Sequence, residues 1–225
     1  MNLGKISVIG GTGDIGEALV KRFSLQNEVV IGSRDPTKAQ DCAQKFSQEV
    51  LQSTGKSVQI TGAGNTEAAS AAEYVILAVP HAFALATAEL ISPHLSPSSI
   101  LISPVVPMAR TSQGFVYVPV TSESGSESMA MALSRIVKVP VVAAFHTLPA
   151  SRLGDVAVTP NFDVLICADS NSALERVADL VKNAPNLRAL TVGGLAMAQV
   201  VESLTPLILN VAIRNKLRNL SLKFI

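Results

Sequence analysis

Six residues near the start of the chain, Gly11-Thr12-Gly13-Asp14-Ile15-Gly16, constrain the fold more than any other part of the sequence. They have the spacing G-x-G-x-x-G and follow an apolar run, residues 6–9, that is typical of a buried strand. The first glycine allows a tight turn, the second lets a pyrophosphate approach backbone N–H groups, and the third lets a helix pack against the strand. Because an amphipathic segment and a second apolar run follow, we interpret the motif as a dinucleotide-binding turn rather than as a turn that serves packing alone. Asp14 is predicted to complement the dipole of the helix that begins there.

Apolar runs typical of strands alternate with segments of helical periodicity along the rest of the chain. This order predicts an α/β fold of the Rossmann type, with a doubly wound, mostly parallel sheet and a smaller C-terminal domain that passes from α/β to helical. We expect the nucleotide-binding domain at residues 1–148 and the smaller domain at 149–225. The serine-rich residues 121–128 predict a solvated loop, with Ser124 or Ser126 capping the next helix. The expected strands are residues 6–9, 29–31, 58–60, 74–78, 100–102, 141–144, 162–168 and 187–192, and the expected helices are 14–25, 36–52, 66–71, 82–91, 123–137, 172–182 and 195–214.

The composition excludes several classes of protein. A formal net charge of +1 and the absence of Trp argue against a nucleic-acid partner. Cys42 and Cys167 lie far apart without Cys or His at ligand spacing, which predicts neither a disulfide framework nor a metal site. The apolar run 74–91 is interrupted by Pro80 and His81, so we expect no membrane span, and the early glycines are not typical of a signal peptide. The expected location is the cytoplasm.

The end of the second strand is the place where a dinucleotide site reads the adenosine ribose. An acidic residue expected about 20 positions after the glycine turn would bind the ribose 2′-hydroxyl, but this chain has Ser33 and Arg34 there. Arginine offers a planar fork of donors that suits a phosphate dianion, and Thr12 and Lys38 add further donors. Asp35 follows too late and is predicted to cap the next helix. We therefore expect NADP(H) rather than NAD(H); the alternative is a basic, solvated helix start.

Two further strand ends are expected to line the same cleft, because ligands bind at the carboxyl ends of parallel strands. The first is Ala78-Val79-Pro80-His81, and the second is the segment SPVVP with Val106. A lone histidine at a strand end, such as His81, serves packing more often than catalysis. The segments FHTLPA, residues 145–150, and VESLTPLILN, residues 201–210, are expected to form the site of a second substrate.

The segments GGTGDIG, GSRDPTK, SPVVP, FHTLPA and VESLTPLILN together resemble, in order and spacing, those of the NADPH-dependent reductases of coenzyme F420, an 8-hydroxy-5-deazaflavin. The resemblance covers nearly the whole chain, and the last two motifs are the most specific. It implies a homodimer that transfers a hydride reversibly between nicotinamide C4 and deazaflavin C5. It also implies that the adenosine 2′-phosphate binds Thr12, Ser33, Arg34 and Lys38, and that the pocket for deazaflavin and nicotinamide is lined by His146, Leu148, Ser203, Thr205 and Leu220.

One position departs from that family pattern. Similar proteins often have an arginine shortly before the VES segment, where this chain has Gln199. If that arginine holds an anionic part of the deazaflavin, then the affinity is lower here, or Arg188 or Arg152 takes its place.

The chemistry needs no assigned catalytic residue, because a hydride passes directly between two stacked rings and the protein supplies position and electrostatics. His146 is a candidate for a hydrogen bond to a ring edge; the alternative is a hydrogen-bonded histidine at a strand end. Two other functions stay open. One is an NADPH-dependent reductase of a small carbonyl or imine, for which Tyr74 and Tyr117 are poor proton donors. The other is a non-catalytic NADPH-sensing protein.

Overall fold

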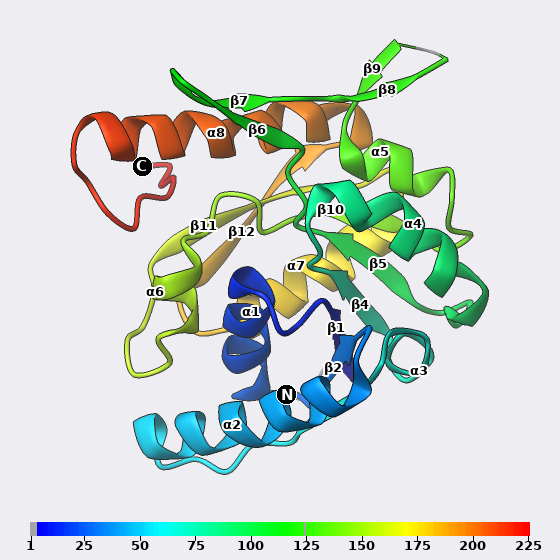
Figure 1. Ribbon diagram of the computed structural model, residues 1–225, viewed down its shortest axis with the longest axis vertical. Helices are drawn as coiled ribbons and strands as arrows, with labels where there is room; N and C mark the ends of the chain where they lie inside the picture. The colour runs from blue at the N-terminus through cyan, green and yellow to red at the C-terminus, as the bar shows by residue number, and fades with distance from the viewer. Residues whose placement is uncertain (1–3, 124) are drawn as a thin grey trace.

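Eight strands form one sheet in the middle of the protein, in the order β12-β11-β10-β5-β4-β1-β2-β3 (Figure 1). The computed structural model describes residues 4–123 and 125–225. The strands from β3 to β10 are parallel, β11 is antiparallel to β10, and β12 is parallel to β11. The predicted Rossmann-type, mostly parallel α/β sheet is therefore confirmed. The strands are β1 (Ile6–Ile9), β2 (Val29–Ser33), β3 (Ile60–Gly64), β4 (Tyr74–Leu77), β5 (Ile100–Ser103), β10 (Val141–Ala143), β11 (Phe162–Cys167) and β12 (Leu187–Gly193).

Helices cover both faces of this sheet, and each face has its own buried apolar cluster. One cluster contains side chains of α1, α2 and α7, and the other contains side chains of α3, α4, α5 and α8. The expected boundary at residues 148/149 falls just before α6, and the two strands that follow extend the same sheet. The helices are α1 (Asp14–Ser24), α2 (Pro36–Thr54), α3 (Asn65–Ser70), α4 (His81–Ile91), α5 (Met129–Ser134), α6 (Ala150–Gly154), α7 (Asn171–Asn183) and α8 (Ala198–Arg214), with 3-10 turns η1 (Ser92–His94) and η2 (Leu195–Met197).

The turn between β1 and α1 depends on close backbone contact. Gly10 has a φ of 81°, in the left-handed region, so the tight turn is made one residue before the motif begins. A Cβ atom on Gly16 would lie 2.4 Å from the carbonyl oxygen of Gly10. Only glycine at 16 therefore lets α1 start directly against the turn, as the third glycine of the motif predicts.

The third strand lies later than predicted. It is Ile60–Gly64 and not residues 58–60, and two of its five residues are glycines. Glycine is unfavourable in strands, but a Cβ atom on Gly62 would lie 2.2 Å from the carbonyl carbon of Ala39 in α2. Close packing of α2 on this edge of the sheet therefore selects a strand that propensity alone does not indicate.

The prediction of a helix at 123–137 was wrong over its first half. Residues on either side of position 124 form a hairpin of β8 (Val120–Ser122) and β9 (Gly125–Glu127), so Ser126 lies in a strand. Ser124, the other proposed cap, lies outside the described residues. The cap of α5 is Ser128, whose side chain accepts a hydrogen bond from the Met131 backbone N–H at 3.0 Å.

A second hairpin that the sequence did not indicate crosses the last helix (Figure 1). It consists of β6 (Met108–Thr111) and β7 (Gly114–Tyr117). Asn210 of α8 binds the backbone of Phe115 in β7 twice, because its Oδ1 accepts from the N–H at 2.8 Å and its Nδ2 donates to the carbonyl at 2.7 Å. The Asn210 side chain thus makes the pair of backbone hydrogen bonds that a neighbouring strand would otherwise make to β7.

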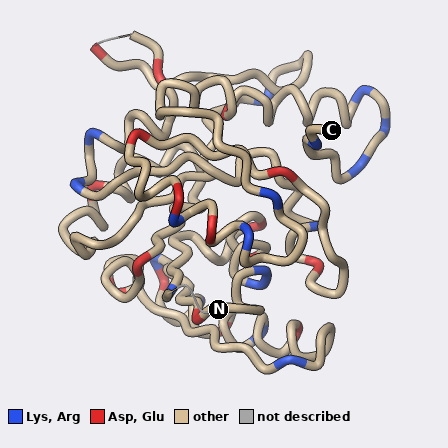
Figure 2. The backbone as a smooth tube through the Cα atoms, turned by 180° about the vertical axis from the view of Figure 1, so that it is seen from behind, with Lys and Arg blue, Asp and Glu red and all other residues tan. Residues whose placement is uncertain are grey.

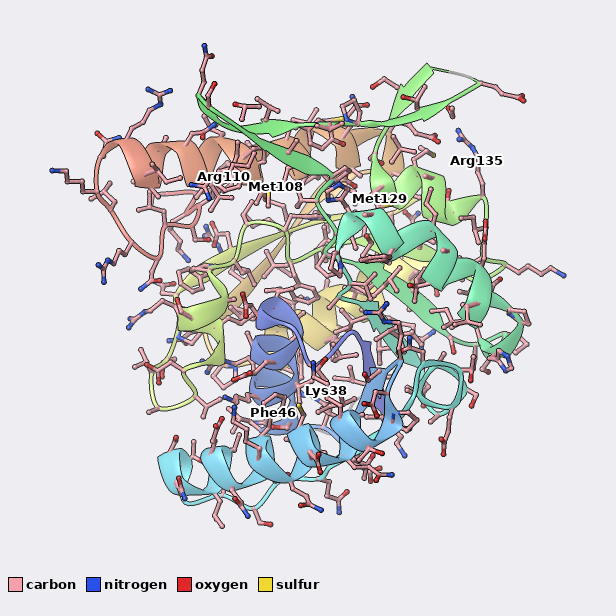
Figure 3. All side chains as sticks on the ribbon, viewed as in Figure 1. Lys38, Phe46, Met108, Arg110, Met129 and Arg135 are labelled. Atoms are coloured by element: carbon pink, nitrogen blue, oxygen red, sulfur yellow. The ribbon has the colours of Figure 1, made fainter. Side chains whose placement is uncertain are left out.

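Glu202 joins α8 to the start of α5 and to β7. Its side chain is buried and accepts hydrogen bonds from the Tyr117 hydroxyl at 2.7 Å and from the backbone N–H groups of Met129 at 3.0 Å and Ala130 at 3.1 Å. Burial raises the pKa of Glu202 to about 7, although the three donors favour its charged form. Figure 3 labels Met129, the first residue of α5. Glu202 therefore fixes the part of α8 that carries the VESLTP residues.

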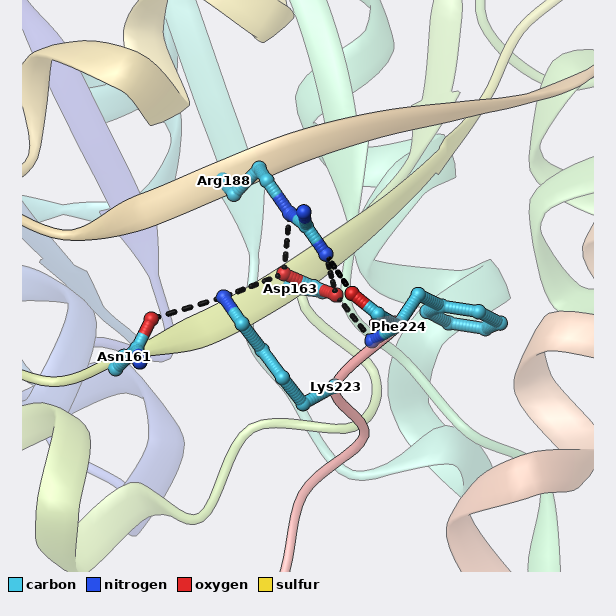
Figure 4. A network of polar contacts seen from close by, with 5 residues as sticks. All are labelled: Asn161, Asp163, Arg188, Lys223 and Phe224. Atoms are coloured by element: carbon cyan, nitrogen blue, oxygen red, sulfur yellow. Dashed lines mark hydrogen bonds and ion pairs between the residues drawn. The ribbon is translucent and has the colours of Figure 1, made fainter.

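A second buried carboxylate holds the C-terminal segment (Figure 4). Asp163 in β11 binds Arg188 of β12 through Nε at 2.8 Å and Nη2 at 2.7 Å. It also accepts from the Lys223 ammonium at 3.0 Å and from the Phe224 backbone N–H at 2.7 Å. These four donors hold the pKa of Asp163 well below its ordinary range, and the Arg188 hydrogen bonds are the largest cause. The last residues of the chain are thereby fixed to the sheet.

One helix of the described part is long and apolar enough to cross a membrane, judged by length and composition alone. It is Leu195–Arg214, which includes η2 and α8, and 22% of its apolar window is buried. A single such helix is weak evidence for a membrane span. Pro206 lies inside α8 and is buried.

Replacing Glu202 by glutamine tests its raised pKa. The folded pKa of about 7 exceeds the ordinary value of 4.5, so the contribution of Glu202 to stability is complete below about pH 4.5 and is lost as the pH rises through 7. Between pH 5 and pH 8 the free energy of unfolding of the wild type should therefore fall relative to Glu202→Gln by up to roughly 3 kcal/mol, measured by urea unfolding. Glu28→Gln is the control, because it removes an exposed carboxylate and leaves Glu202 in place, so the fall in unfolding free energy between pH 5 and pH 8 should remain. A constant difference between the wild type and Glu202→Gln would contradict the assignment.

Candidate functional site

A cavity of about 770 Å³ opens at the carboxyl ends of β1, β2, β3 and β4. This is the edge of a parallel sheet where ligands bind, and it lies where the strand order reverses between β1 and β4. The cavity is lined by Gly10, Thr12, Gly13, Ser33, Arg34, Asp35, Lys38, Asn65, Ala78, Val79, Pro80, Phe83, Ala86, Thr87 and Leu90.

Most of the residues predicted to bind the nucleotide line this cavity. They come from the turn after β1, from the end of β2 and the start of α2, and from the segment before α4. They are Thr12, Gly13, Ser33, Arg34, Lys38, Ala78, Val79 and Pro80. Lys38 lies in the first turn of α2 (Figure 3). Two hydroxyls and two cations thus line one cavity, and this donor set fits a phosphate.

Six other predicted residues do not line the cavity. Gly11 and Gly16 are buried in the turn itself, and Ile15 packs against the apolar core. Asp14 is exposed and faces a separate hollow beside Glu17 and Lys21. His81, the exposed first residue of α4, and Val106, half-buried after β5, also lie outside its lining.

The acidic residue next to the basic pair is already engaged in the backbone. Asp35 caps α2, since its Oδ1 accepts from the N–H groups of Thr37 at 3.0 Å and Lys38 at 3.2 Å. These hydrogen bonds confirm the predicted cap. They also direct the carboxylate toward the N-terminus of α2. The Arg34 guanidinium instead lies over the ring of Phe83, 5.4 Å from its centroid. This stacking holds the exposed guanidinium on the α4 side of the cavity.

Sequence reasoning missed the far wall of this cavity. Phe83, Ala86, Thr87 and Leu90 come from one face of α4, at the i, i+3, i+4 and i+7 spacing of a helix stripe. That spacing was a usable signal. Asn65 was missed because the third strand was placed too early, so that its carboxyl end was not recognised.

A second cavity of about 300 Å³ follows the carboxyl end of β10. Four of the five residues predicted for the second substrate line it together, namely His146, Leu148, Thr205 and Leu220. Ser203 does not, because its hydroxyl donates to the Val200 carbonyl at 2.7 Å within α8. The remaining lining residues are Thr147, Pro149, Ala150, Ser151, Ile208, Leu209, Ala212 and Asn219.

His146 is buried, and burial lowers the pKa of its imidazole to about 3. The ring is therefore neutral at physiological pH. Neither ring nitrogen has a hydrogen-bond partner within residues 4–123 and 125–225. The backbone of the same residue is fixed, since the Thr205 hydroxyl donates to the His146 carbonyl at 2.8 Å. The second cavity thus contains a neutral imidazole that can donate one hydrogen bond and accept another.

The substitutes considered for the missing arginine lie outside the second cavity. Arg188 is bound to Asp163, and Arg152 is an exposed residue of α6. Gln199 points to the β8–β9 hairpin, where its Nε2 donates to the Ser126 hydroxyl at 3.4 Å. In the part of the chain that the structure describes, no group of three or more His, Cys, Asp or Glu side chains could hold a metal ion.

Comparisons with known proteins find relatives that match nearly the whole chain. The family model for "NADP oxidoreductase coenzyme F420-dependent" matches residues 5–107. An F420-dependent NADP reductase of Methanothermobacter thermautotrophicus is 37% identical over 97% of this chain and 94% of its own. The enzyme of that name from Methanocaldococcus jannaschii is 31% identical over 94% of both chains.

A solved structure shares the whole fold. It is that of an Arthrobacter sp. FB24 protein assigned to the F420-dependent NADP reductases, with a TM-score of 0.79, 24% identity and coverage of 99% of both chains. On the identity to its relatives over nearly its full length, the chain belongs to the family of F420-dependent NADP reductases.

Proposed function

We propose that the protein is an oxidoreductase that transfers a hydride reversibly between NADP(H) and the deazaflavin coenzyme F420. The observation that carries this is the presence of two cavities at one edge of a parallel sheet, one with phosphate-binding donors and the other built by the FHTLPA and VESLTPLILN residues. When bound, NADP(H) supplies or accepts the hydride at nicotinamide C4, and F420 exchanges it at deazaflavin C5.

The first cavity is the proposed site of NADP(H). Arg34, Lys38, Ser33 and Thr12 hold the adenosine 2′-phosphate, and the turn at 11–16 presents backbone N–H groups to the pyrophosphate. Ala78, Val79 and Pro80 support the nicotinamide half, with Val106 and His81 nearby on the same sheet edge. The apolar face of α4 receives the adenine.

The second cavity is the proposed site of the deazaflavin ring. Leu148, Leu220 and the apolar face of α8 exclude water and hold the ring flat, which is what direct hydride transfer requires. His146 orients the ring by a hydrogen bond from its neutral imidazole, and Thr205 fixes the backbone that carries it. Ser203 serves the helix rather than the ring. No side chain is needed as an acid.

A basic segment lies beside this cavity. Ala212 and Asn219 both line it, and the chain between them carries Arg214, Lys216 and Arg218. Figure 2 shows Lys and Arg along this end of the chain, near the C-terminus. We infer that these residues take over the attraction for an anionic part of F420 that Gln199 does not provide.

The assembly is proposed to be a cytoplasmic homodimer without nucleic acid or membrane as a partner. Val200, Leu207 and Val211 expose apolar surface on α8, and Val116 and Val118 add more nearby. A second copy of this chain would cover that surface. Residues 149–225 would then complete the deazaflavin site and supply dimer contacts, next to the nucleotide domain at 1–148.

The reaction itself is tested by mixing the purified protein with NADPH and oxidised F420. We expect loss of the deazaflavin absorbance at a rate proportional to protein concentration, and its return when NADP⁺ is added to reduced F420. If NADPH binds but the deazaflavin absorbance does not fall, the result would favour a non-catalytic NADPH-sensing protein. Oxidation of NADPH by small imines or carbonyls alone would favour a reductase of that class, although Tyr117 is engaged with Glu202, and burial raises the pKa of its hydroxyl further.

Arg34→Ala tests the preference for NADP(H). Loss of a charge-assisted contact to the 2′-phosphate should weaken NADPH binding by about 10- to 100-fold and NADH binding by less than about twofold. Fluorescence titration of both nucleotides gives the two values. Arg110→Ala is the matched control, because Arg110 also lies over a phenylalanine ring, Phe115, but outside the cavity. Equal losses for both nucleotides would contradict the role of Arg34.

Leu207→Glu tests the dimer surface. Light scattering after gel filtration should give twice the chain mass of 23.5 kDa for the wild type and a single chain mass for Leu207→Glu, because a buried carboxylate is costly at an apolar interface. Leu51→Glu changes another exposed leucine, on α2, and should leave the dimer intact. A wild-type protein that elutes as a single chain would rule out the dimer.

A further inference from the structure

We propose that Asn65 is a binding residue for the adenosine ribose of NADP(H), and that its being an amide rather than a carboxylate contributes to the choice of NADP(H) over NAD(H). The proposal rests on the proposed use of NADP(H) and names a residue on the side of the cavity formed by β3. No motif in the sequence indicates it, since Asn65 comes 49 positions after the glycine turn ends at Gly16.

Asn65 lies in the wall of the nucleotide cavity and has a buried hydrogen-bonding atom without a partner. The residue is 8% exposed and lines the same cavity as Ser33 and Arg34. Its Oδ1 is buried and has no hydrogen-bond partner in the described residues 4–123 and 125–225. A buried polar atom without a partner is unfavourable, and most such atoms in proteins are bonded. A ligand hydroxyl in the cavity would satisfy this one.

A local structural role does not account for the side chain. Asn65 is the first residue of α3, but the cap of that helix is Gly64 and no side chain caps it. Asparagine is also less favourable than alanine inside a helix. Helix capping therefore does not explain why residue 65 carries an amide side chain.

The position of the amide points to the ribose. β2 and β3 are paired so that Ser33 lies opposite Gly64, which places Asn65 beside the end of β2. Oδ1 lies 3.3 Å from the place where a Cβ atom on Gly32 would be. The end of β2 is where dinucleotide sites read the ribose, usually with a carboxylate. An amide oxygen accepts from a ribose hydroxyl as a carboxylate does, but it does not repel a 2′-phosphate.

Asn65→Ala separates binding from folding. We expect the Kd for NADPH and for NADH, measured by fluorescence titration, to rise about five- to tenfold, because the ribose 3′-hydroxyl is common to both. The melting temperature of the nucleotide-free protein should stay unchanged or rise, since the replacement removes a buried acceptor without a partner. Unchanged NADPH binding, or a loss of several degrees in melting temperature, would overturn the proposal.

Asn27→Ala is the matched control. Asn27 is also a buried asparagine, 6% exposed, but its Nδ2 donates to the Phe23 carbonyl at 3.2 Å. It precedes β2 and therefore lies at the amino end of that strand, away from the cavity. This variant should lose stability and keep the wild-type Kd for NADPH. Together the two variants show that a lower affinity of Asn65→Ala does not come from a weakened fold.

Asn65→Asp tests the choice between the two nucleotides. A carboxylate still accepts from a ribose hydroxyl, so the Kd for NADH should stay within about twofold of the wild type. The new charge beside the 2′-phosphate should raise the Kd for NADPH at least about tenfold, and added salt should reduce the difference. Equal changes for both nucleotides would place the amide away from the ribose. A wild type that binds neither nucleotide would refute the proposed function, whereas a wild type that binds NADPH as tightly as Asn65→Asp does would refute only this inference.

Discussion

Helix α1 can begin directly against strand β1 only because positions 10 and 16 lack side chains. The backbone of Gly10 turns through the left-handed region, and its carbonyl oxygen occupies the space that a side chain on residue 16 would need. This contact sets the direction of α1 and leaves its first N–H groups facing the space above β1. The nucleotide cavity, the neighbouring end of β2 and the wall formed by α4 are all arranged around that helix start.

Much of this arrangement could be predicted from local sequence. The glycine spacing, the alternation of strands and helices, and the replacement of an acid by Ser33 and Arg34 all act over fewer than about 30 residues, which is the span of one β-α-β unit. The structure brings Arg34 and Lys38 to one cavity and Asp35 to the end of α2, as those patterns indicate. The residues of the second cavity came from family resemblance, because nothing in FHTLPA alone names a ligand.

The features that were missed depend on partners distant in sequence. β3 forms at Ile60–Gly64, where Gly62 allows close contact with Ala39 of α2. Strand propensity does not register such a contact and therefore favoured residues 58–60. The β6–β7 hairpin is held by Asn210, which is 95 residues from Phe115. Asn65 could not be placed at a strand end until that strand was located correctly. In each case tertiary contact overrides a local preference.

Two buried carboxyl groups with different electrostatic surroundings fix the C-terminal third of the chain. Asp163 has cationic partners and stays charged, whereas Glu202 has only neutral donors and titrates near neutrality. The first fixes the segment that carries Leu220, and the second fixes the part of α8 that carries Thr205. The walls of the second cavity are therefore positioned by two carboxyl groups that lie outside it.

Pro206 gives α8 an uneven stiffness. Proline has no N–H group, so the backbone carbonyl of Glu202, four residues earlier, lacks its usual donor in the helix. The turn between Glu202 and Pro206 is thus the easiest place for α8 to bend. On its N-terminal side the helix is held by the Glu202 side chain, and on its C-terminal side Ile208, Leu209 and Ala212 line the second cavity. Bending there would widen or narrow the second cavity and leave the nucleotide cavity unchanged. The deazaflavin would therefore meet a wall that can yield, and the nucleotide a rigid one.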